Sequence, residues 1–365
     1  MKLTRRAFAS GFVAATCVRE AVSAQPSSQG ASSGSLTDVP GVGVGHWTDT
    51  RRPTGCTAIL FDPDAAVAVD YNGSAPGETG VVLLQPVSPV ETVHGLFLTG
   101  GGLFGLGAHA GMIGYLEDQK RGFDWGGTLR VPVVPGAVID DLALGDPTIR
   151  PDPQAAYKAC EAASTKPVAE GNVGAGAGAT VGRMVRRHTA GGMKGGLGTV
   201  SLRLGDVIVA ALAVVNAAGD VLDWRNGKIV AGARRPDGKG FADIVEVLKR
   251  TISTPNALKD VLHDPFLRST TLIIVATNVT LDKTQLTKVA MMANCGAARV
   301  IRPYHTTGDG DQLFAVSTRQ LDRDDVDTTV VGTLAAEVVA DAVFRGVTTA
   351  TSVEGWPAAR DIRPL

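Results

Sequence analysis

The chain is poor in the residues that metal centres, disulfide frameworks and nucleic-acid surfaces require. Only 4 of its 365 residues are cysteine, and no Cys-x-x-Cys pair occurs, so neither a zinc site nor a disulfide framework is indicated. Aromatic residues make up 5%, and 35 basic residues are balanced by 36 acidic ones. Nucleic-acid-binding proteins usually carry a clustered basic excess, so this class is not favoured.

Several catalytic signatures are missing as well. The sequence contains no His-Glu-x-x-His, no Walker loop and no Gly-x-Ser-x-Gly, so zinc peptidases, P-loop nucleotidases and α/β-hydrolases lack their motifs. No run of about 18 uncharged apolar residues follows the first 24 residues, so we expect a soluble mature protein with no membrane partner. With 44% hydrophobic and 19% charged residues, the composition is that of a folded chain.

The first 24 residues have the pattern of an export signal. A basic start is followed by a small, apolar stretch over Ala7–Val18 and by small residues at Val22–Ala24, which is typical of a cleaved signal peptide. Thr4–Phe8 matches the twin-arginine pattern; an ordinary basic leader is the simpler alternative. We therefore expect a periplasmic or secreted protein with a signal at 1–24, a flexible linker at 25–35 and one domain at 36–365.

Removal of that signal leaves Cys56, Cys160 and Cys295. Their odd number and wide spacing favour buried free thiols. One disulfide is the alternative in an oxidising compartment.

Beyond the linker, short apolar runs alternate with glycine-rich turns. The span Arg234–Ser269 is charge-rich and contains three prolines, so it is interpreted as an exposed connector. The apolar runs predict strands over Ala58–Phe61, Val67–Tyr71, Gly95–Thr99, Val131–Val134, Val207–Val214, Leu272–Thr277 and Gln312–Ser317. Helices are predicted over Phe104–Gln119, Gln154–Ala163, Lys283–Asn294 and Leu334–Phe344.

Gly100–Gly105 satisfies Gly-x-Gly-x-x-Gly between a predicted strand and a predicted helix. Dinucleotide binding would require an acidic residue ending a second strand about 20 residues further on. Gly122–Gly127 stands there instead and is predicted to be a loop. Close packing of helix on strand is the simpler reading of the glycines.

The most informative segment is Arg268–Asn278, where the connector gives way to an apolar strand at two threonines, Thr270 and Thr271. Threonine pairs at strand starts are commonly structural. A threonine hydroxyl that acts as a nucleophile needs a base, and no Ser/His/Asp arrangement is evident. The residue's own α-amino group, with a pKa of roughly 8, is suitable, provided that the chain is cut immediately before Thr270.

Two carboxylates follow downstream. Asp309 and Asp311 flank Gly310 just before the predicted strand Gln312–Ser317. A turn with solvated side chains is one reading, and a weak calcium loop is another, although the further ligands of an EF-hand are missing. If both carboxylates face Thr270, their mutual repulsion raises one pKa.

Taken together, these segments resemble the DmpA-type family of self-cleaving N-terminal-nucleophile hydrolases. This family includes L-aminopeptidase/D-Ala-esterases, β-peptidyl aminopeptidases and nylon-oligomer hydrolases. The resemblance runs from about Leu36 to Val347 and rests on the Thr270 strand, the Asp309 loop and several glycine-rich segments. These segments are Leu36–Val42, Gly45–Trp47, Thr54–Thr57, the Gly100 loop, Glu170–Gly176, Lys194–Gly198 and Val215–Asn216.

The resemblance implies an α+β fold, a four-layer αββα sandwich cleaved between Ser269 and Thr270 into fragments 25–269 and 270–365. Thr270 would be the nucleophile and its new amine the base. Asn216 would be the oxyanion-hole amide, and Asp309 and Asp311 would match the acidic pair of nylon-oligomer hydrolases. No metal or organic cofactor is implied, and relatives are usually homo-oligomers, often tetramers.

This sequence departs from the family pattern at three positions. Ser269 stands before the cut where relatives often have Asn or Gly, so we expect slower processing. Arg183 replaces a common Lys and, unlike Lys, cannot donate a proton near neutral pH. Asp140 replaces a common aromatic ahead of Asp141, and its carboxylate would suit a substrate ammonium group. With Arg183, Asp140 and Asp141, the glycines Gly101 and Gly102 complete the predicted substrate-binding set.

We therefore expect a periplasmic, N-terminal-threonine aminopeptidase that hydrolyses short peptides or peptide-like amides through an acyl-enzyme. A nylon-oligomer (6-aminohexanoate) amidase is the close alternative. An acyl transferase similar to ornithine acetyltransferases is a second alternative. A non-catalytic periplasmic binding protein, with the glycine loops as ligand cradles, is a third.

Overall fold

The computed structural model describes residues 34–185, 189–256, 258 and 269–362. The predicted signal segment 1–24 and residues 25–33 of the predicted linker lie outside these ranges, so both stay predictions. Among the described residues, no helix is long and apolar enough to cross a membrane.

Nine strands of the described chain form one sheet, in the order β10-β11-β14-β16-β2-β4-β7-β3, with β1 paired to β2. The chain positions of these strands are β1 (Val42–Thr48), β2 (Gly55–Asp70), β3 (Glu78–Thr79), β4 (Val93–Thr99), β7 (Gly136–Val138), β10 (Gly196–Leu204), β11 (Val207–Asn216), β14 (Thr270–Val279) and β16 (Gln312–Leu321). The pairing of β14 with β16 and of β4 with β7 is parallel, and the other pairings are antiparallel.

Helices cover this sheet, and short ribbons lie at its margins. The α-helices are α1 (His109–Asp118), α2 (Pro153–Glu161), α3 (Ile244–Ile252), α5 (Lys283–Val300) and α6 (Thr328–Thr348). The short strands are β5 (Phe123–Trp125), β6 (Leu129–Val131), β8 (Thr180–Val181), β9 (Met193–Lys194), β12 (Asp220–Asp223), β13 (Lys228–Ala231) and β15 (Ile301–Arg302). The 3₁₀ turns are η1 (Leu36–Asp38), η2 (Val81–Leu84), η3 (Gly102–Ala108), η4 (Gly174–Gly176) and η5 (Ala359–Asp361).

Strand β2 joins the two halves of the sheet. Its first part, Gly55–Leu60, pairs with β1 and β4, and its last part, Ala66–Asp70, pairs with β16. The pairing register shifts between Leu60 and Ala65. One strand therefore forms backbone hydrogen bonds with both halves of the sheet: with β1 and β4 at its start and with β16 at its end.

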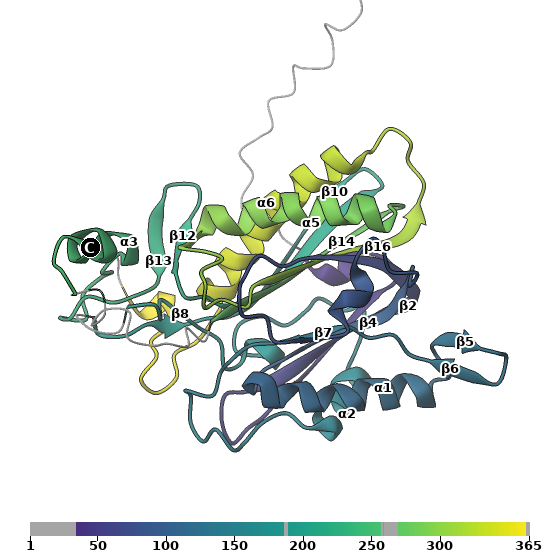
Figure 1. Cartoon of the computed structure of the whole chain (residues 1–365), viewed down its shortest axis with the longest axis horizontal. Coiled ribbons are helices and arrows are strands. Elements are labelled where there is room, and N and C mark those ends of the chain that lie inside the picture. Colours follow the sequence, from purple (N-terminus) through teal and green to yellow (C-terminus); the bar gives the residue numbers. More distant parts are fainter. Residues whose placement is uncertain (1–33, 186–188, 257, 259–268, 363–365) are drawn as a thin grey trace, which may run out of the picture. The chain divides into compact units, whose positions relative to one another are not determined.

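The buried residues separate into layers that follow the two-residue period of the strands. On β11, Val209, Ala211 and Ala213 pack with α5 and α6, whereas the alternate residues pack with apolar side chains of β1, β2 and β4. A third cluster joins the other face of β2 and β4 to α1 and α2. The order is therefore helices, sheet, sheet, helices, which confirms the predicted αββα sandwich. Figure 1 shows α5 and α6 on one side of the strands and α1 and α2 on the other.

Capping residues fix where the two long helices begin. Asp282 accepts a hydrogen bond from the Gln285 N–H, and the Gln285 side chain accepts one in return from the Asp282 N–H. This capping box starts α5. Asp327 accepts from the N–H groups of Thr329 and Val330 and starts α6. The two helices therefore begin at residues that the sequence marks as helix caps.

Some elements differ from the sequence-based expectations. The two strands predicted at Ala58–Phe61 and Val67–Tyr71 are one long strand, β2. The predicted loop Gly122–Gly127 contains β5, which forms a hairpin with β6. The predicted strand Val131–Val134 overlaps β6 only at Val131. The connector Arg234–Ser269 contains helix α3, whose Ile244 is buried.

The glycines of Gly100–Gly105 serve close packing in this structure. A Cβ on Gly105 would lie 1.9 Å from the carbonyl oxygen of Gly100, so only glycine allows the turn to follow the strand so tightly. The Gly101 N–H donates to the carboxylate of Asp141 at 2.9 Å. In a dinucleotide-binding loop a backbone N–H of this kind would bind the phosphate. Here the Gly101 N–H is already bound to the Asp141 side chain.

Candidate active site

Thr270 and Asn216 face each other on neighbouring strands. Thr270 is the first residue of β14, and its cross-strand partner on β11 is Asn216, the last residue of that strand. Directly opposed side chains lie on the same face of an antiparallel pair, about 5 Å apart at Cβ. Thr270 shares this face with Leu272 and Ile274, which pack between the two halves of the sheet. The predicted nucleophile and the predicted oxyanion amide are therefore side by side.

The peptide bond before Thr270 is held by its neighbours. The Thr270 hydroxyl donates to the Ser269 carbonyl oxygen at 2.7 Å, and the Gly310 N–H donates to the same oxygen at 2.9 Å. Ser269 and Asp309 form a parallel bridge. A Cβ on Gly310 would lie 2.8 Å from Thr270 Oγ1, so glycine is required for this close approach. Two donors thus converge on the carbonyl of the predicted cleavage site.

The acidic pair surrounds this junction. Asp311 Oδ1 accepts from the Thr271 N–H at 2.6 Å, and its Oδ2 accepts from the His305 N–H at 3.2 Å. Asp309 Oδ2 accepts from the N–H and the hydroxyl of Thr306 at 2.8 and 2.7 Å. Among the described residues, Asp309 Oδ1 is buried without a hydrogen-bond partner. Both carboxylates lie beside the start of β14.

The environment of Asp309 favours its protonated form. Burial, and next the neighbouring charge of Asp311, raise the pKa of Asp309 to about 7, although the Thr306 hydrogen bonds oppose this. One of the two carboxyls is therefore poised to exchange a proton near neutral pH.

His305 is a neighbour of this pair that the sequence analysis did not single out. Its Nδ1 lies 3.3 Å from Asp311 Oδ2, its ring stacks on Tyr304, and its backbone has a φ of 55°. A non-glycine residue in this left-handed region is uncommon and marks a conformation that surrounding contacts impose. His305 precedes Asp311 by six residues in the chain, and only the folded loop brings its ring to that carboxylate.

The side-chain amide of Asn216 has a fixed orientation. Its Oδ1 accepts from the Thr180 N–H at 3.0 Å and from the Thr180 hydroxyl at 3.3 Å, and its Nδ2 donates to the Asp140 carbonyl at 3.4 Å. The accepting end of the amide is thus held by β8. The donating end is directed to the other side, toward the Asp140 carbonyl oxygen.

Lys194 supports the same region and was not predicted as a site residue. It is fully buried, and its Nζ donates to the carbonyls of Gly176, Ala179 and Gly195 at 3.2, 2.8 and 2.8 Å. Burial lowers the pKa of Lys194 to about 7, with the charge of Asp141 acting in the opposite sense. The ammonium fixes the segment that ends at Thr180, the residue that holds Asn216. In the sequence it stands between Met193 and Gly195, and nothing in that local pattern marks it as a site residue.

The predicted substrate-binding residues separate into two groups. Asp141 is fully buried, where it pairs with Arg52 at 2.5 Å and accepts from Thr54 at 2.6 Å. Burial raises the pKa of Asp141, while the Arg52 charge opposes the shift. With Gly101, it forms an internal contact rather than a surface that a substrate can reach.

Asp140 and Arg183 lie at the site itself. Arg183 Nη1 donates at 3.3 Å to the Asp140 carbonyl oxygen that Asn216 Nδ2 also approaches. A Cβ on Gly102 would lie 3.8 Å from the Asp140 carboxyl carbon. The structure therefore brings Arg183, Asp140 and Asn216 together and places Gly102 beside them.

No cluster of three or more His, Cys, Asp or Glu side chains suited to a metal ion occurs among the described residues. Cys56 and Cys160 are buried free thiols, as expected, whereas Cys295 is a free thiol on the surface, contrary to the expectation of burial.

Comparison with solved structures defines the class of fold. The chain resembles the L-aminopeptidase D-Ala-esterase/amidase of Ochrobactrum anthropi, described as a variant of the Ntn hydrolase fold. The TM-score is 0.61 with 22% identity, and the similarity covers 88% of each chain. The chain thus has the layered fold of N-terminal-nucleophile hydrolases.

Comparison of sequences defines the family. The profile of peptidase family S58 matches residues 34–360, and the chain belongs to this family. An uncharacterized aminopeptidase of Mycobacterium tuberculosis is 36% identical over 90% of this chain and 98% of its own length. A 6-aminohexanoate-oligomer endohydrolase of Kocuria is 32% identical over 84% of each chain. These relatives support a hydrolase and confirm the family resemblance drawn from the sequence.

Proposed function

We propose that this protein is an autoprocessed N-terminal-threonine amide hydrolase. The observation that carries the proposal is the juxtaposition of Thr270 with Asn216 beside a buried acidic pair. Thr270 Oγ would attack the Ser269 carbonyl carbon and form an ester as the peptide nitrogen leaves to become the Thr270 amine. Water would then hydrolyse the ester and release the carboxyl group of Ser269. The Gly310 N–H, 2.9 Å from the Ser269 oxygen, is suited to stabilise the developing negative charge.

The mature site would hydrolyse amides by a similar sequence. Thr270 Oγ attacks the substrate carbonyl, the Thr270 amine accepts the hydroxyl proton, and Asn216 Nδ2 stabilises the oxyanion. The proton passes to the leaving amine, and water releases the acid from the acyl-enzyme. The aminopeptidase relatives favour short peptides or peptide-like amides with a free amino terminus as substrates.

A nylon-oligomer amidase is the second candidate function. Two features favour it: the Asp309–Asp311 pair beside Thr270, and the similarity to a 6-aminohexanoate-oligomer endohydrolase. Hydrolysis of a linear 6-aminohexanoate oligomer, compared with hydrolysis of α- and β-aminoacyl p-nitroanilides, distinguishes the two candidates.

We also propose twin-arginine export to the periplasm and assembly into homo-oligomers. The pattern of Thr4–Phe8 supports the first of these proposals. Fractionation of the native host and the solution mass of the purified protein test them.

The test of the proposed function is self-cleavage. Wild-type protein should give two bands on a denaturing gel, the smaller one with the N-terminal sequence Thr270-Thr271-Leu272. Thr270→Ala should give one uncut band and no amide hydrolysis. Thr271→Val is the matched control, because the Thr271 hydroxyl is buried without a hydrogen-bond partner among the described residues; it should be cut normally. A single wild-type band would favour a binding protein, and turnover that depends on an acceptor amine would favour a transferase.

A further inference from the structure

A cavity of about 400 Å³ opens beside the candidate active site. It is lined by Ala143, Gly182, Arg183, Val185, Gly191, Gly192 and Trp356. Arg183 and Asn216 both approach the carbonyl oxygen of Asp140. One lining residue of the cavity, Arg183, therefore lies close to the amide of Asn216.

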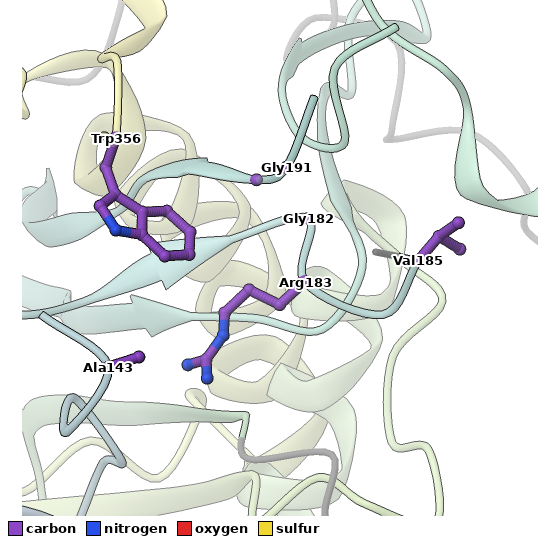
Figure 2. Close-up of a pocket in the computed structure, with 7 residues that line it drawn as sticks. Ala143, Gly182, Arg183, Val185, Gly191 and Trp356 are labelled. Atoms are coloured by element: carbon purple, nitrogen blue, oxygen red, sulfur yellow. The ribbon is translucent and has the colours of Figure 1, made fainter. Parts of the chain in front are cut away.

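The cavity has one cationic wall. Arg183 is the only charged side chain among the described residues that line it, and only 6% of its surface is exposed. Figure 2 shows its guanidinium group next to Ala143 and, in this view, below the indole of Trp356. A guanidinium is planar and presents paired N–H donors that match the two oxygens of a carboxylate. A carboxylate is therefore the substrate group that this wall suits.

The remaining walls are apolar or made of backbone. Trp356, Ala143, Val185 and the three glycines offer an indole face, small aliphatic groups and exposed peptide groups. A volume near the lower end of the usual range for small-molecule sites suits a short chain rather than a folded partner. The cavity thus combines room for a few methylene groups with a single anion-binding group.

The charges at the two ends of the proposed substrate determine which end of it the cavity binds. In a linear amide with a free amino terminus, the acyl portion carries the ammonium group and the leaving portion carries the carboxylate. We propose that the Arg183–Trp356 cavity binds the terminal carboxylate of the leaving portion. The protein then prefers short amides in which a free carboxylate lies a few atoms beyond the scissile nitrogen. The assignment of the cavity to the leaving portion rests on the proposed function.

Direct binding tests this proposal without catalysis. The probes are the N-acetyl derivatives of glycine, β-alanine, 4-aminobutyrate and 6-aminohexanoate, each with its uncharged C-terminal amide, titrated calorimetrically into the wild-type protein. At least one acid should bind about tenfold or more tightly than its own amide, the range expected for a charge-assisted hydrogen-bonded pair. The N-acetyl amino acid with the largest ratio of acid affinity to amide affinity shows which spacing between its amide group and its carboxylate fits the site.

Variants locate the effect. Arg183→Gln should bring the acid-to-amide ratio close to one, whereas Arg183→Lys should retain part of the preference. Arg130→Gln, which removes a half-exposed arginine on β6, should leave the ratio unchanged. Trp356→Ala should weaken acid and amide alike, and this keeps the test decisive if Arg183→Gln fails to fold.

The outcomes separate this proposal from the proposed function. Equal affinity for acid and amide in every pair, or an unchanged preference in Arg183→Gln, overturns the carboxylate site even if self-cleavage and hydrolysis are found. A clear preference that requires Arg183 supports the site even if the purified chain stays uncut. An Arg183→Gln variant that lowers kcat equally for acid and amide substrates and binds both probes equally would assign Arg183 to the chemical step instead.

Discussion

Replacement of Asn216 by aspartate tests the proposed oxyanion site most sharply. The variant Asn216→Asp keeps an oxygen where Oδ1 now accepts from the Thr180 N–H at 3.0 Å. It replaces the Nδ2 donor, which faces the side of Asp140, with an oxygen that cannot donate when ionised. The side chain keeps its shape, but the new carboxyl is buried and faces the Asp140 carbonyl oxygen, so loss of the donor comes with a cost in folding free energy.

The expected magnitude follows from the donor that is lost. Removal of one oxyanion-hole donor lowers kcat by about 10²- to 10³-fold, or roughly 3–4 kcal/mol of transition-state stabilisation. Asn216→Ala loses this donor as well and also leaves the Thr180 N–H unsatisfied, which costs about 1–3 kcal/mol of folding free energy. Both variants should therefore unfold below the wild type, the alanine variant by several degrees and the aspartate variant because its new carboxyl is buried against a carbonyl oxygen.

The assay combines kinetics with thermal unfolding on processed protein. The cleaved fraction of each preparation is measured first on a denaturing gel, and kcat and KM are then determined with an aminoacyl p-nitroanilide. We expect kcat and the melting temperature to fall in both variants, and KM to change little. A processed Asn216→Asp enzyme with kcat near the wild-type value would refute the oxyanion assignment.

Three further predictions concern the surroundings of Thr270. Because burial raises the pKa of Asp309 to about 7, the native state holds more protons than the unfolded chain between about pH 4 and 7. The contribution of Asp309 to the free energy of unfolding therefore falls as the pH rises through this window. Asp309→Asn should flatten the pH dependence of the melting temperature. An unchanged slope in this variant would contradict the assignment. Lys194→Met removes three hydrogen bonds donated by a buried ammonium, each worth about 1.5–3 kcal/mol, although the Gly176 and Ala179 carbonyls each keep a backbone N–H donor. Calorimetry should show a larger drop in melting temperature than for Asn216→Ala, and a wild-type melting curve would rule out the supporting role. Gly310→Ala places a Cβ against Thr270 Oγ1 and should slow self-cleavage in a time course on gels. Gly114→Ala, with open space around the added methyl, is its control, and equal cleavage rates for the two would count against the close approach.

Much of the fold could be predicted because its elements carry local signals. The predicted strand Leu272–Thr277 lies within β14, and the predicted helix Lys283–Asn294 forms the first two-thirds of α5, which starts at the Asp282 capping box. The joining of two predicted strands into β2 could not be foreseen, because the turn-like Asp62–Asp64 segment continues the strand only when both halves of the sheet pair with it.

The candidate site shows a similar division. Thr270, Asp309 and Asp311 stand out in the sequence, since a strand start and a carboxylate pair around a glycine are local patterns. Lys194 and Trp356 do not, because their importance depends on contacts with segments distant in the chain. Lys194 is recognisable only once the carbonyls of Gly176 and Ala179 surround it. Trp356 is recognisable as a candidate binding residue only once the fold places it in the same cavity as Arg183.

The strand order has a further consequence for the two predicted fragments. Strands β14 and β16, which follow residue 269, lie between β11 and β2, which precede it. Residues from both sides of the proposed cut therefore interleave within a single hydrogen-bonded ladder. Separation of the pieces would remove the middle of the sheet and strip α5 and α6 from their support, so dissociation and denaturation are the same event. A cut at this junction would free a new amino terminus while this ladder holds the two fragments together.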